Sequence, residues 1–384
     1  MTGAKVKAGG FPIVLHRRGP VSSKGSVLLI HGASATTETF ELPNGGLVDY
    51  LQQRDWDVWT LDWRGSARVV EKVLESPPVP DRNGEYRNFT LDQVAHEDIP
   101  WALACMQQEL GKQQHLAVVA HCFGSGAMAI ALAAEQAKAV RNVVLSTLGL
   151  FYEAPWDGWI KAEDFILERV LANAPQQRVI DPRKYEQWPA DMRSAYEMFP
   201  AQWLPDGSSE ADRILQRLTF MFGQPYPKEA LAAGIHGAKL SSLFGAMHLG
   251  LYLHAGQLVR RGYAARFDAL DTFDPPRPTL QLRRTRSKGA PSYRAPREPQ
   301  RIDGHYLLPD GFRDKRITLI TGTENRLWHR DGIDRMYEWL LAEAPPRGDG
   351  RRPRKHVLPG FAHQDLLWGK ESHKVYELIE QGLG

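Results

Sequence analysis

The chain has 384 residues, enough for one large domain with an insertion or for two domains. Its 48 Lys and Arg residues against 45 Asp and Glu residues give a net charge of +3, too small to indicate nucleic acid as a general partner. Two cysteines, Cys105 and Cys122, cannot form a disulfide framework, and residues 1–15 lack the apolar segment of a secretory signal. We therefore expect a cytoplasmic location.

Neither a membrane span nor a metal site is predicted. The most apolar long window, residues 240–259, contains His248, His254 and Gln257 and is more typical of internal helices. The two histidines are six residues apart, so they do not share a helix face and do not predict metal ligation. The oligomeric state is left open.

The first part of the chain alternates between apolar strands and helices. Predicted strands cover residues 11–16, 26–30, 57–61, 116–119 and 140–146, and a helix begins at Thr90 and ends near Leu110. The strand at 26–30 is continuously apolar, which is typical of a sheet covered on both faces. This alternation predicts the βαβ units of a mostly parallel sheet.

Residues 120–126 organise the rest of the chain. They read Ala-His-Cys-Phe-Gly-Ser-Gly and connect the apolar run at 116–119 to a helix of small apolar residues. A strand that turns sharply into a helix through small residues, with one nucleophile at the turn, is the geometry of a nucleophile elbow. The nucleophile would be Cys122, with the N–H of Phe123 as one oxyanion-hole donor. The turn after the strand at 26–30 would supply the other, from Ala33.

The regular alternation of strands and helices is interrupted from residue 151 to residue 311. We predict that this segment is a helical cap inserted between strands. The segment concentrates aromatic residues, and we expect them to line a lipophilic pocket. They are Trp156, Trp159, Trp188, Tyr196, Phe199, Trp203, Phe220 and Phe222. The core would then comprise residues 1–150 and 312–384.

Two basic stretches could bind an anionic group, such as the phosphates of a coenzyme A thioester or an acidic carrier protein. A solvated loop is the simpler interpretation of both. The first stretch contains Arg283, Arg284, Arg286, Lys288, Arg294, Arg297 and Arg301, and the second contains Arg351, Arg352, Arg354 and Lys355.

Strand patterns return at residues 316–320 and 355–358, and a closing helix begins near Glu371. The loop after the last strand carries His363 in the run Pro-Gly-Phe-Ala-His-Gln-Asp. A histidine at this position follows the nucleophile along the chain, as a general base would.

These motifs together resemble the α/β-hydrolase fold. The resemblance rests on Leu-Ile-His-Gly at 29–32, Asp-Trp-Arg-Gly at 62–65, the elbow at 120–124 and the loop at 359–363, which span nearly all of the core. It implies an α/β architecture with helices on both faces of the sheet. The cysteine elbow also resembles those of dienelactone hydrolases and polyhydroxyalkanoate synthases.

A narrower resemblance is to the hydrolase-like region joined to some glucose-methanol-choline oxidoreductases of the cholesterol oxidase type. It rests on residues 121–125, 322–325 and 360–365. The chain has no Gly-x-Gly-x-x-Gly after a first strand, so no flavin or other cofactor is expected.

The elbow favours a covalent mechanism. A thiol at a helix N-terminus and close to an imidazole is expected to have a lowered pKa and to be partly thiolate near neutral pH. His363 would take the proton of Cys122 and later protonate the leaving group.

The sequence offers three candidates for the residue that orients His363. In the resembling fold an acid stands three residues after the glycine that corresponds to Gly322, and here that position holds Asn325. An amide can orient a histidine in a Cys-His-Asn arrangement. Glu324 and Glu153 are the alternatives.

The sequence thus predicts an acyl hydrolase of the esterase, lactonase or thioesterase type that acts on a bulky hydrophobic substrate. One alternative is an acyltransferase or synthase that passes the acyl group to an amine, thiol or alcohol, including by cyclisation. Another is a non-catalytic lipid- or sterol-binding protein on the same scaffold.

Overall fold

The structure, a computed structural model, describes residues 3–7, 11–19, 24–43, 45–75, 89–111, 116–163, 166–174, 177–268, 304–345 and 352–384. Its centre is an eight-stranded sheet with the order β1-β2-β4-β3-β5-β6-β9-β10. The strands are β1 (Gly3–Val6), β2 (Val14–Arg17), β3 (Ser26–Ile30), β4 (Asp57–Asp62), β5 (Leu116–His121), β6 (Val140–Ser146), β9 (Arg316–Gly322) and β10 (Arg354–Leu358). The first two strands are antiparallel to their neighbours and the remaining pairs are parallel. The predicted mostly parallel sheet is therefore confirmed.

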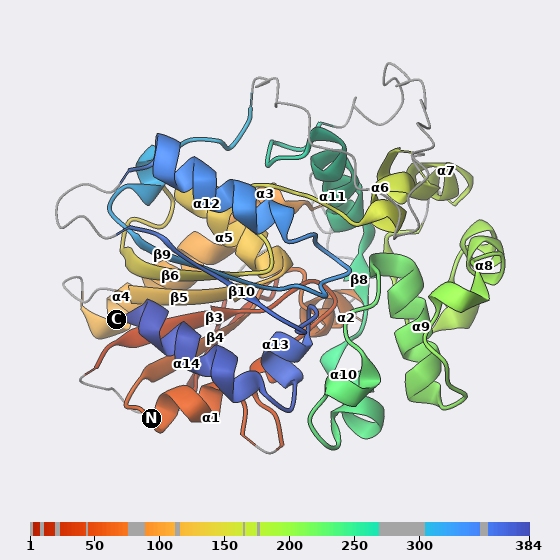
Figure 1. Cartoon of the computed structure of the whole chain (residues 1–384), viewed down its shortest axis with the longest axis horizontal. Coiled ribbons are helices and arrows are strands. Elements are labelled where there is room, and N and C mark those ends of the chain that lie inside the picture. The colour runs from red at the N-terminus through yellow and green to blue at the C-terminus, as the bar shows by residue number, and fades with distance from the viewer. Residues whose placement is uncertain are drawn as a thin grey trace.

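Helices cover both faces of this sheet (Figure 1). The core helices are α1 (Leu47–Gln52), α2 (Ala67–Glu75), α3 (Leu91–Gln93), α4 (Ile99–Leu110), α5 (Phe123–Ala133), α12 (Asp331–Glu343), α13 (Asp365–Trp368) and α14 (Ser372–Leu383). In Figure 1, α5 and α12 lie above the sheet and α1 and α14 below it. Every residue of β3, β5 and α5 is buried, which explains why these segments are apolar throughout and show no alternation.

Two helix starts follow the sequence signals. Thr90 caps α3, because its side-chain oxygen accepts a hydrogen bond from the N–H of Asp92. A π-helical turn (Val94–Asp98) then joins α3 to α4, where Pro100 has no N–H for the regular helical bond. The closing helix α14 begins one residue after Glu371.

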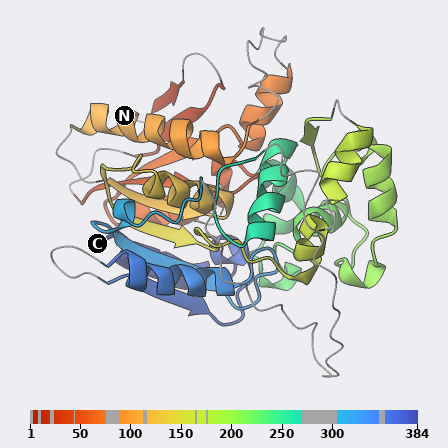
Figure 2. The same ribbon diagram turned by 90° about the horizontal axis from the view of Figure 1, so that it is seen from above.

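A second, mainly helical region lies between β6 and β9 and forms a cap at one end of the sheet (Figure 2). Its elements are α6 (Trp156–Glu163), α7 (Ile166–Asn173), β7 (Val179–Ile180), α8 (Ala190–Glu197), α9 (Glu210–Phe222), α10 (Leu240–Leu243), β8 (Met247–His248) and α11 (Leu249–Arg261). The window at 240–259 forms α10, β8 and α11, as internal elements. In the part of the chain that the structure describes, no helix is both long enough and apolar enough to cross a membrane.

The chain rejoins the main hydrophobic core soon after α11. Tyr263, Ala264 and Ala265 pack in the same buried cluster as the residues of α5, and Tyr306 and Phe312 join it before β9 begins. The first basic stretch, from Arg283 to Arg301, and Arg351 of the second lie outside the described residues. Within the second stretch, Lys355 donates a hydrogen bond to Asp334 at 2.5 Å and Arg354 donates to the carbonyl of Gln381 at 3.3 Å.

Candidate active site

Cys122 stands at a sharp turn between β5 and α5. Its backbone has φ 55° and ψ −128°, a conformation that non-glycine residues rarely adopt and that marks stored strain. The turn is held by the N–H of Cys122, which donates to the carbonyl of Ser146, and by the N–H of Gly126, which donates to the carbonyl of Cys122, both at 3.0 Å. The predicted sharp turn from strand to helix is therefore present at Cys122, and its role as a nucleophile elbow stays a prediction.

The small residues around the elbow are required by close backbone approaches. A Cβ on Gly124 would lie 2.4 Å from the carbonyl oxygen of His31, and a Cβ on Gly32 would lie 2.9 Å from the Cβ of Cys122. Both distances are far below ordinary van der Waals contact. The glycines thus let the loop after β3 pack directly against the elbow.

Two backbone N–H groups meet the sulfur of Cys122. They belong to Ala33 and Phe123, and both favour a negative charge on the sulfur through hydrogen bonding. The loop that carries Ala33 is fixed by the next residue, since the Ser34 hydroxyl donates to the carbonyl of Gly245 at 2.5 Å. The N–H of Gly245 donates back to the carbonyl of Ser34 at 2.8 Å. The two N–H groups predicted for an oxyanion hole thus lie at the Cys122 sulfur, and a segment of the cap holds one of them in place.

The Cys122 thiol is not activated at rest, contrary to the sequence-based expectation. Burial raises its pKa to about 11, and this effect exceeds the opposing hydrogen bonds from Trp328, Phe123 and Ala33. The pKa of His363 is well below its usual value of 6.5, because the ring is buried and lies near His121. A thiol and a neutral imidazole are therefore the resting state at neutral pH, instead of a thiolate and an imidazolium.

His363 lies in the loop between β10 and α13, where it is buried and lines the same cavity as Cys122. Its ring centroid is 4.8 Å from that of His121, the residue before the nucleophile. Nδ1 of His363 is buried and has no hydrogen-bond partner among the described residues. The structure thus brings the predicted base and nucleophile to one cavity, with the Nδ1 atom unpaired.

Asn325 is buried in the loop after β9, and its oxygen is already engaged. The Oδ1 atom accepts hydrogen bonds from the N–H groups of Leu327 and Trp328 at 3.0 and 3.1 Å. Its Nδ2 atom is buried without a partner among the described residues. In this conformation Asn325 shapes the loop that carries Trp328, and its oxygen accepts no hydrogen bond from His363.

The two carboxylate alternatives lie in different surroundings. Glu324 is exposed, and its carboxylate accepts a hydrogen bond from the hydroxyl of Thr323 at 3.0 Å. Glu153 is buried and forms an ion pair with Arg335. Neither contact directs a carboxylate toward His363.

Trp328 is a site residue that the sequence analysis missed. Its side chain hydrogen-bonds the sulfur of Cys122. Its ring packs edge-on against Phe123 and Tyr152, with centroid distances of 5.8 and 5.5 Å. No local pattern in the sequence marks this role, because it depends on the path of the loop between β9 and α12.

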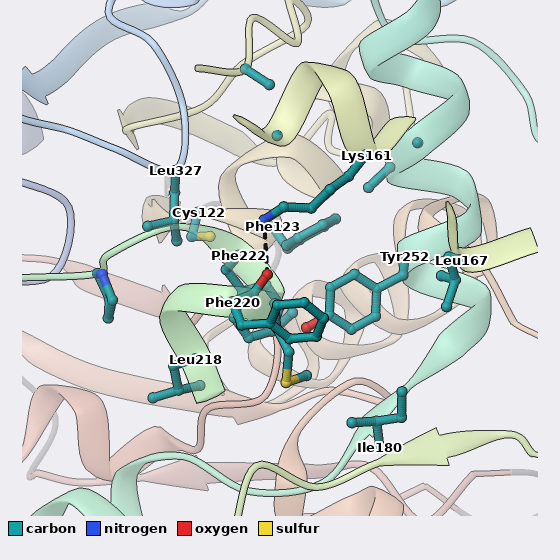
Figure 3. Close-up of a pocket in the computed structure, with 18 of the residues that line it drawn as sticks. Cys122, Phe123, Lys161, Leu167, Ile180, Leu218, Phe220, Phe222, Tyr252 and Leu327 are labelled. Carbon is teal, nitrogen blue, oxygen red and sulfur yellow. Dashed lines mark hydrogen bonds between the residues drawn. The ribbon is translucent and has the colours of Figure 1, made fainter. Parts of the chain in front are cut away.

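A cavity of about 190 Å³ lies between Cys122 and the cap (Figure 3). Most of its lining is apolar, and about half of the lining residues come from α6, α7, α9 and α11. Two charged side chains, Lys161 and Glu168, also reach it. The lining includes Gly32, Ala33, Cys122, Phe123, Lys161, Glu168, Phe220, Phe222, Tyr252, Leu327, Trp328 and His363.

The expectation that the cap's tryptophans line the pocket is wrong. Of the eight predicted aromatic residues, only Phe220 and Phe222 are part of the lining. Trp188 belongs to a separate small core within the cap, while Trp156 and Trp203 are 41% and 49% exposed. Aromatic content predicted a lipophilic cavity but could not tell which face of each helix meets it.

No group of three His, Cys, Asp or Glu side chains in the described ranges is arranged to hold a metal ion. The described site therefore places a thiol, an imidazole and two backbone N–H groups beside an apolar cavity. This set of groups can support acyl transfer.

Comparisons with known proteins agree with this architecture. The sequence model of the family described as alpha/beta hydrolase fold matches residues 25–179. Human lipase member K is 33% identical over 109 residues, which cover 28% of this chain and 26% of that protein. The chain thus matches about a quarter of the length of such curated relatives.

Two solved structures align along the whole chain. A lipase in its open form has a TM-score of 0.57 at 14% identity and is covered over 97% of its length. A soluble variant of monoglyceride lipase from Saccharomyces cerevisiae, in complex with a substrate analogue, has a TM-score of 0.55 at 14% identity and is covered over 95%. Both alignments cover 100% of this chain. Together with the sheet order and the strained turn at Cys122, they show that the chain has the α/β-hydrolase fold.

Proposed function

We propose that this protein is an acyl hydrolase that cleaves an ester, lactone or thioester of a bulky hydrophobic acyl group, with Cys122 as nucleophile. The observation that carries the proposal is the strained Cys122, which meets the N–H groups of Ala33 and Phe123 beside an apolar cavity. Strain at a single non-glycine residue is kept where the position of its side chain matters. The lipases among its relatives support the same class of reaction.

The first half of the proposed reaction forms an acyl thioester. Sγ of Cys122 attacks the substrate carbonyl carbon while its proton passes to neutral His363. The carbonyl oxygen becomes an oxyanion held by the N–H groups of Ala33 and Phe123, each worth about 3 kcal/mol where such donors have been removed in other enzymes. As the oxyanion collapses, the bond to the leaving group breaks and His363 returns the proton to that group.

The second half releases the acid. His363 takes a proton from water, whose oxygen attacks the thioester carbonyl, and the C–S bond then breaks with the proton returning to the sulfur. Because Cys122 starts as a thiol and the second nucleophile is neutral water, His363 must accept a proton during each attack on carbon. An amine, thiol or alcohol could take the place of water by the same steps, which is the acyltransferase alternative.

Intact-protein mass spectrometry with activated acyl esters tests the proposal. We expect one acyl adduct on the wild-type protein, none on Cys122→Ala, and an unchanged adduct on Cys105→Ala. Cys105 is a matched control because it lies in α4, away from the cavity lining. No adduct with any acyl donor would favour the non-catalytic binding protein.

The products then separate hydrolysis from transfer. We expect free acid to remain the main product when amine, thiol or alcohol acceptors are added. If the added acceptor takes most of the acyl group, the protein is a transferase. The acyl donors should include thioesters of coenzyme A and of a carrier protein. Their turnover would test the prediction that the basic stretch at 283–301 binds an anionic group.

A further inference from the structure

Tyr252 places an unpaired hydroxyl at the cavity. It belongs to α11, and its ring stacks on that of Phe222 with a centroid distance of 4.9 Å and an interplanar angle of 17°. The hydroxyl oxygen is buried and has no hydrogen-bond partner among the described residues. A buried hydroxyl without a partner is unfavourable, and an acceptor on a bound ligand would relieve this.

This hydroxyl is a hydrogen-bond donor under all ordinary conditions. Burial and the nearby charge that Cys122 would carry as a thiolate both raise the pKa of Tyr252 well above 10. The O–H is therefore kept, and it can donate to an oxygen atom of a ligand.

Lys161 adds a second donor from α6. Its ammonium group has three N–H bonds, and its polar contacts are the carbonyl of Phe220 at 2.8 Å and Asp157 at 3.5 Å. The ammonium also lies 5.6 Å from the centroid of the Phe199 ring. Figure 3 shows the side chains of Lys161 and Tyr252 reaching the same cavity, with Lys161 bonded to the Phe220 carbonyl. Among the described residues, two oxygen atoms face this ammonium, so one of its N–H bonds can still be donated to an oxygen of a ligand.

The charges at the cavity are already balanced. Asp157 lies beside Lys161, and Glu168 forms an ion pair with Arg260 at 3.2 Å. A carboxylate on the ligand would bring an unbalanced charge into an apolar cavity, which is costly. A neutral oxygen acceptor, such as a keto or hydroxyl group, satisfies the donors without that cost.

We propose that the cavity selects acyl chains that carry a neutral oxygen acceptor away from the scissile carbonyl, with Tyr252 as the main donor and Lys161 as the second. This inference rests on the proposed function, because it names the substrate class of that site. Tyr252 is then a specificity-determining residue and takes no part in bond breaking.

The test compares p-nitrophenyl decanoate with decanoates that bear one oxo group at successive positions along the chain. At one position we expect the wild-type kcat/KM to exceed that for decanoate by about tenfold, the upper range for one net hydrogen bond. Hydroxydecanoates should show a preference at the same position, whereas a half-ester of a dicarboxylic acid should show none.

Two variants show whether the Tyr252 hydroxyl causes the preference for the oxo group. Tyr252→Phe should remove most of the oxo-to-decanoate ratio, because it loses only the hydroxyl. Tyr185→Phe should keep the ratio, since that hydroxyl bonds Glu197 on the exposed side of the cap. An equal kcat/KM for all positions, a preference for the carboxylate, or an unchanged ratio in Tyr252→Phe would each overturn the proposal.

Binding separates this inference from the proposed function. Calorimetry on Cys122→Ala with methyl oxodecanoates and methyl decanoate measures the preference without turnover. If the oxo compound binds more tightly but the wild type never forms an acyl adduct, the proposed function fails and the inference stands. If turnover occurs and neither kcat/KM nor binding distinguishes the two chains, the inference fails alone.

Discussion

The core and the cap of this protein bury their side chains in different ways. In the core, β3, β5 and α5 are buried along their whole length, and close contacts fix the backbone at Cys122. In the cap, helices are amphipathic, and Trp156, Met198 and Trp203 remain exposed. Under the proposed function, the core would set the reaction through its backbone, and the cap would set the substrate through a few inward side chains.

The largest expected effect is at the elbow itself. Gly124→Ala would place a Cβ 2.4 Å from the carbonyl oxygen of His31, and a backbone atom cannot move aside as a side-chain end would. We expect a loss of about 1–3 kcal/mol in the free energy of unfolding and a loss of most turnover. Urea unfolding and kcat/KM measure both effects.

The control for this substitution is Gly3→Ala, because a Cβ there meets no atom within 4 Å. If Gly124→Ala matched Gly3→Ala in stability and rate, the backbone around Cys122 would tolerate a Cβ, and the contrast between a rigid core and the cap would fail.

The pH profile tests the protonation state of the core site. The proposed base is neutral His363, whose pKa is lowered, so kcat/KM should stay constant as pH falls to 6.5 and decline only below that depressed pKa. Because the pKa of Cys122 is about 11, no alkaline limb from the thiol should appear below about pH 10. A bell-shaped profile centred near neutral pH would instead indicate a thiolate–imidazolium pair.

Substitutions at the adjacent residues Asn325 and Glu324 test which of them, if either, positions His363. Asn325→Ala removes the oxygen that binds the N–H groups of Leu327 and Trp328, so we expect a loss of about 1–2 kcal/mol in stability and about tenfold in kcat. Glu324→Ala changes an exposed carboxylate and should alter stability by less than about 0.5 kcal/mol. Full turnover in both variants would mean that neither residue positions the site.

A smaller effect should come from the contact between cap and core. Ser34→Ala removes the hydroxyl that donates to Gly245, and we expect kcat to fall several-fold because the loop that carries Ala33 loses a restraint. Trp203→Ala is the control in the cap, as its ring is half exposed and lies outside the cavity lining. Equal kcat values in the two variants would show that the contact with the cap does not position the loop that carries Ala33.

The elbow could be predicted because its signal is local. A buried strand, small residues and an apolar helix follow one another around Cys122, and each has its own sequence pattern. The same holds for the strands of the mostly parallel sheet and for the start of the helix at Thr90.

The remaining features depend on packing between distant segments. Trp328 and Tyr252 reach the site from a loop and a cap helix whose paths no local pattern reveals. The thiol pKa was predicted in the wrong direction because helix position can be inferred from the sequence whereas the extent of burial cannot. The cap's tryptophans were misplaced for a similar reason, since composition does not say which face of a helix turns inward.

The pairing of Ala35 with Phe244 means that the cap stabilises a loop of the core. These residues form an antiparallel bridge, and the neighbouring Ser34 and Gly245 exchange hydrogen bonds in both directions. The cap is therefore not a module that could be exchanged for another without loss. A recombinant chain with a foreign cap would have to retain residues 244–245, or rebuild their contacts, before its loop after β3 could take the native course.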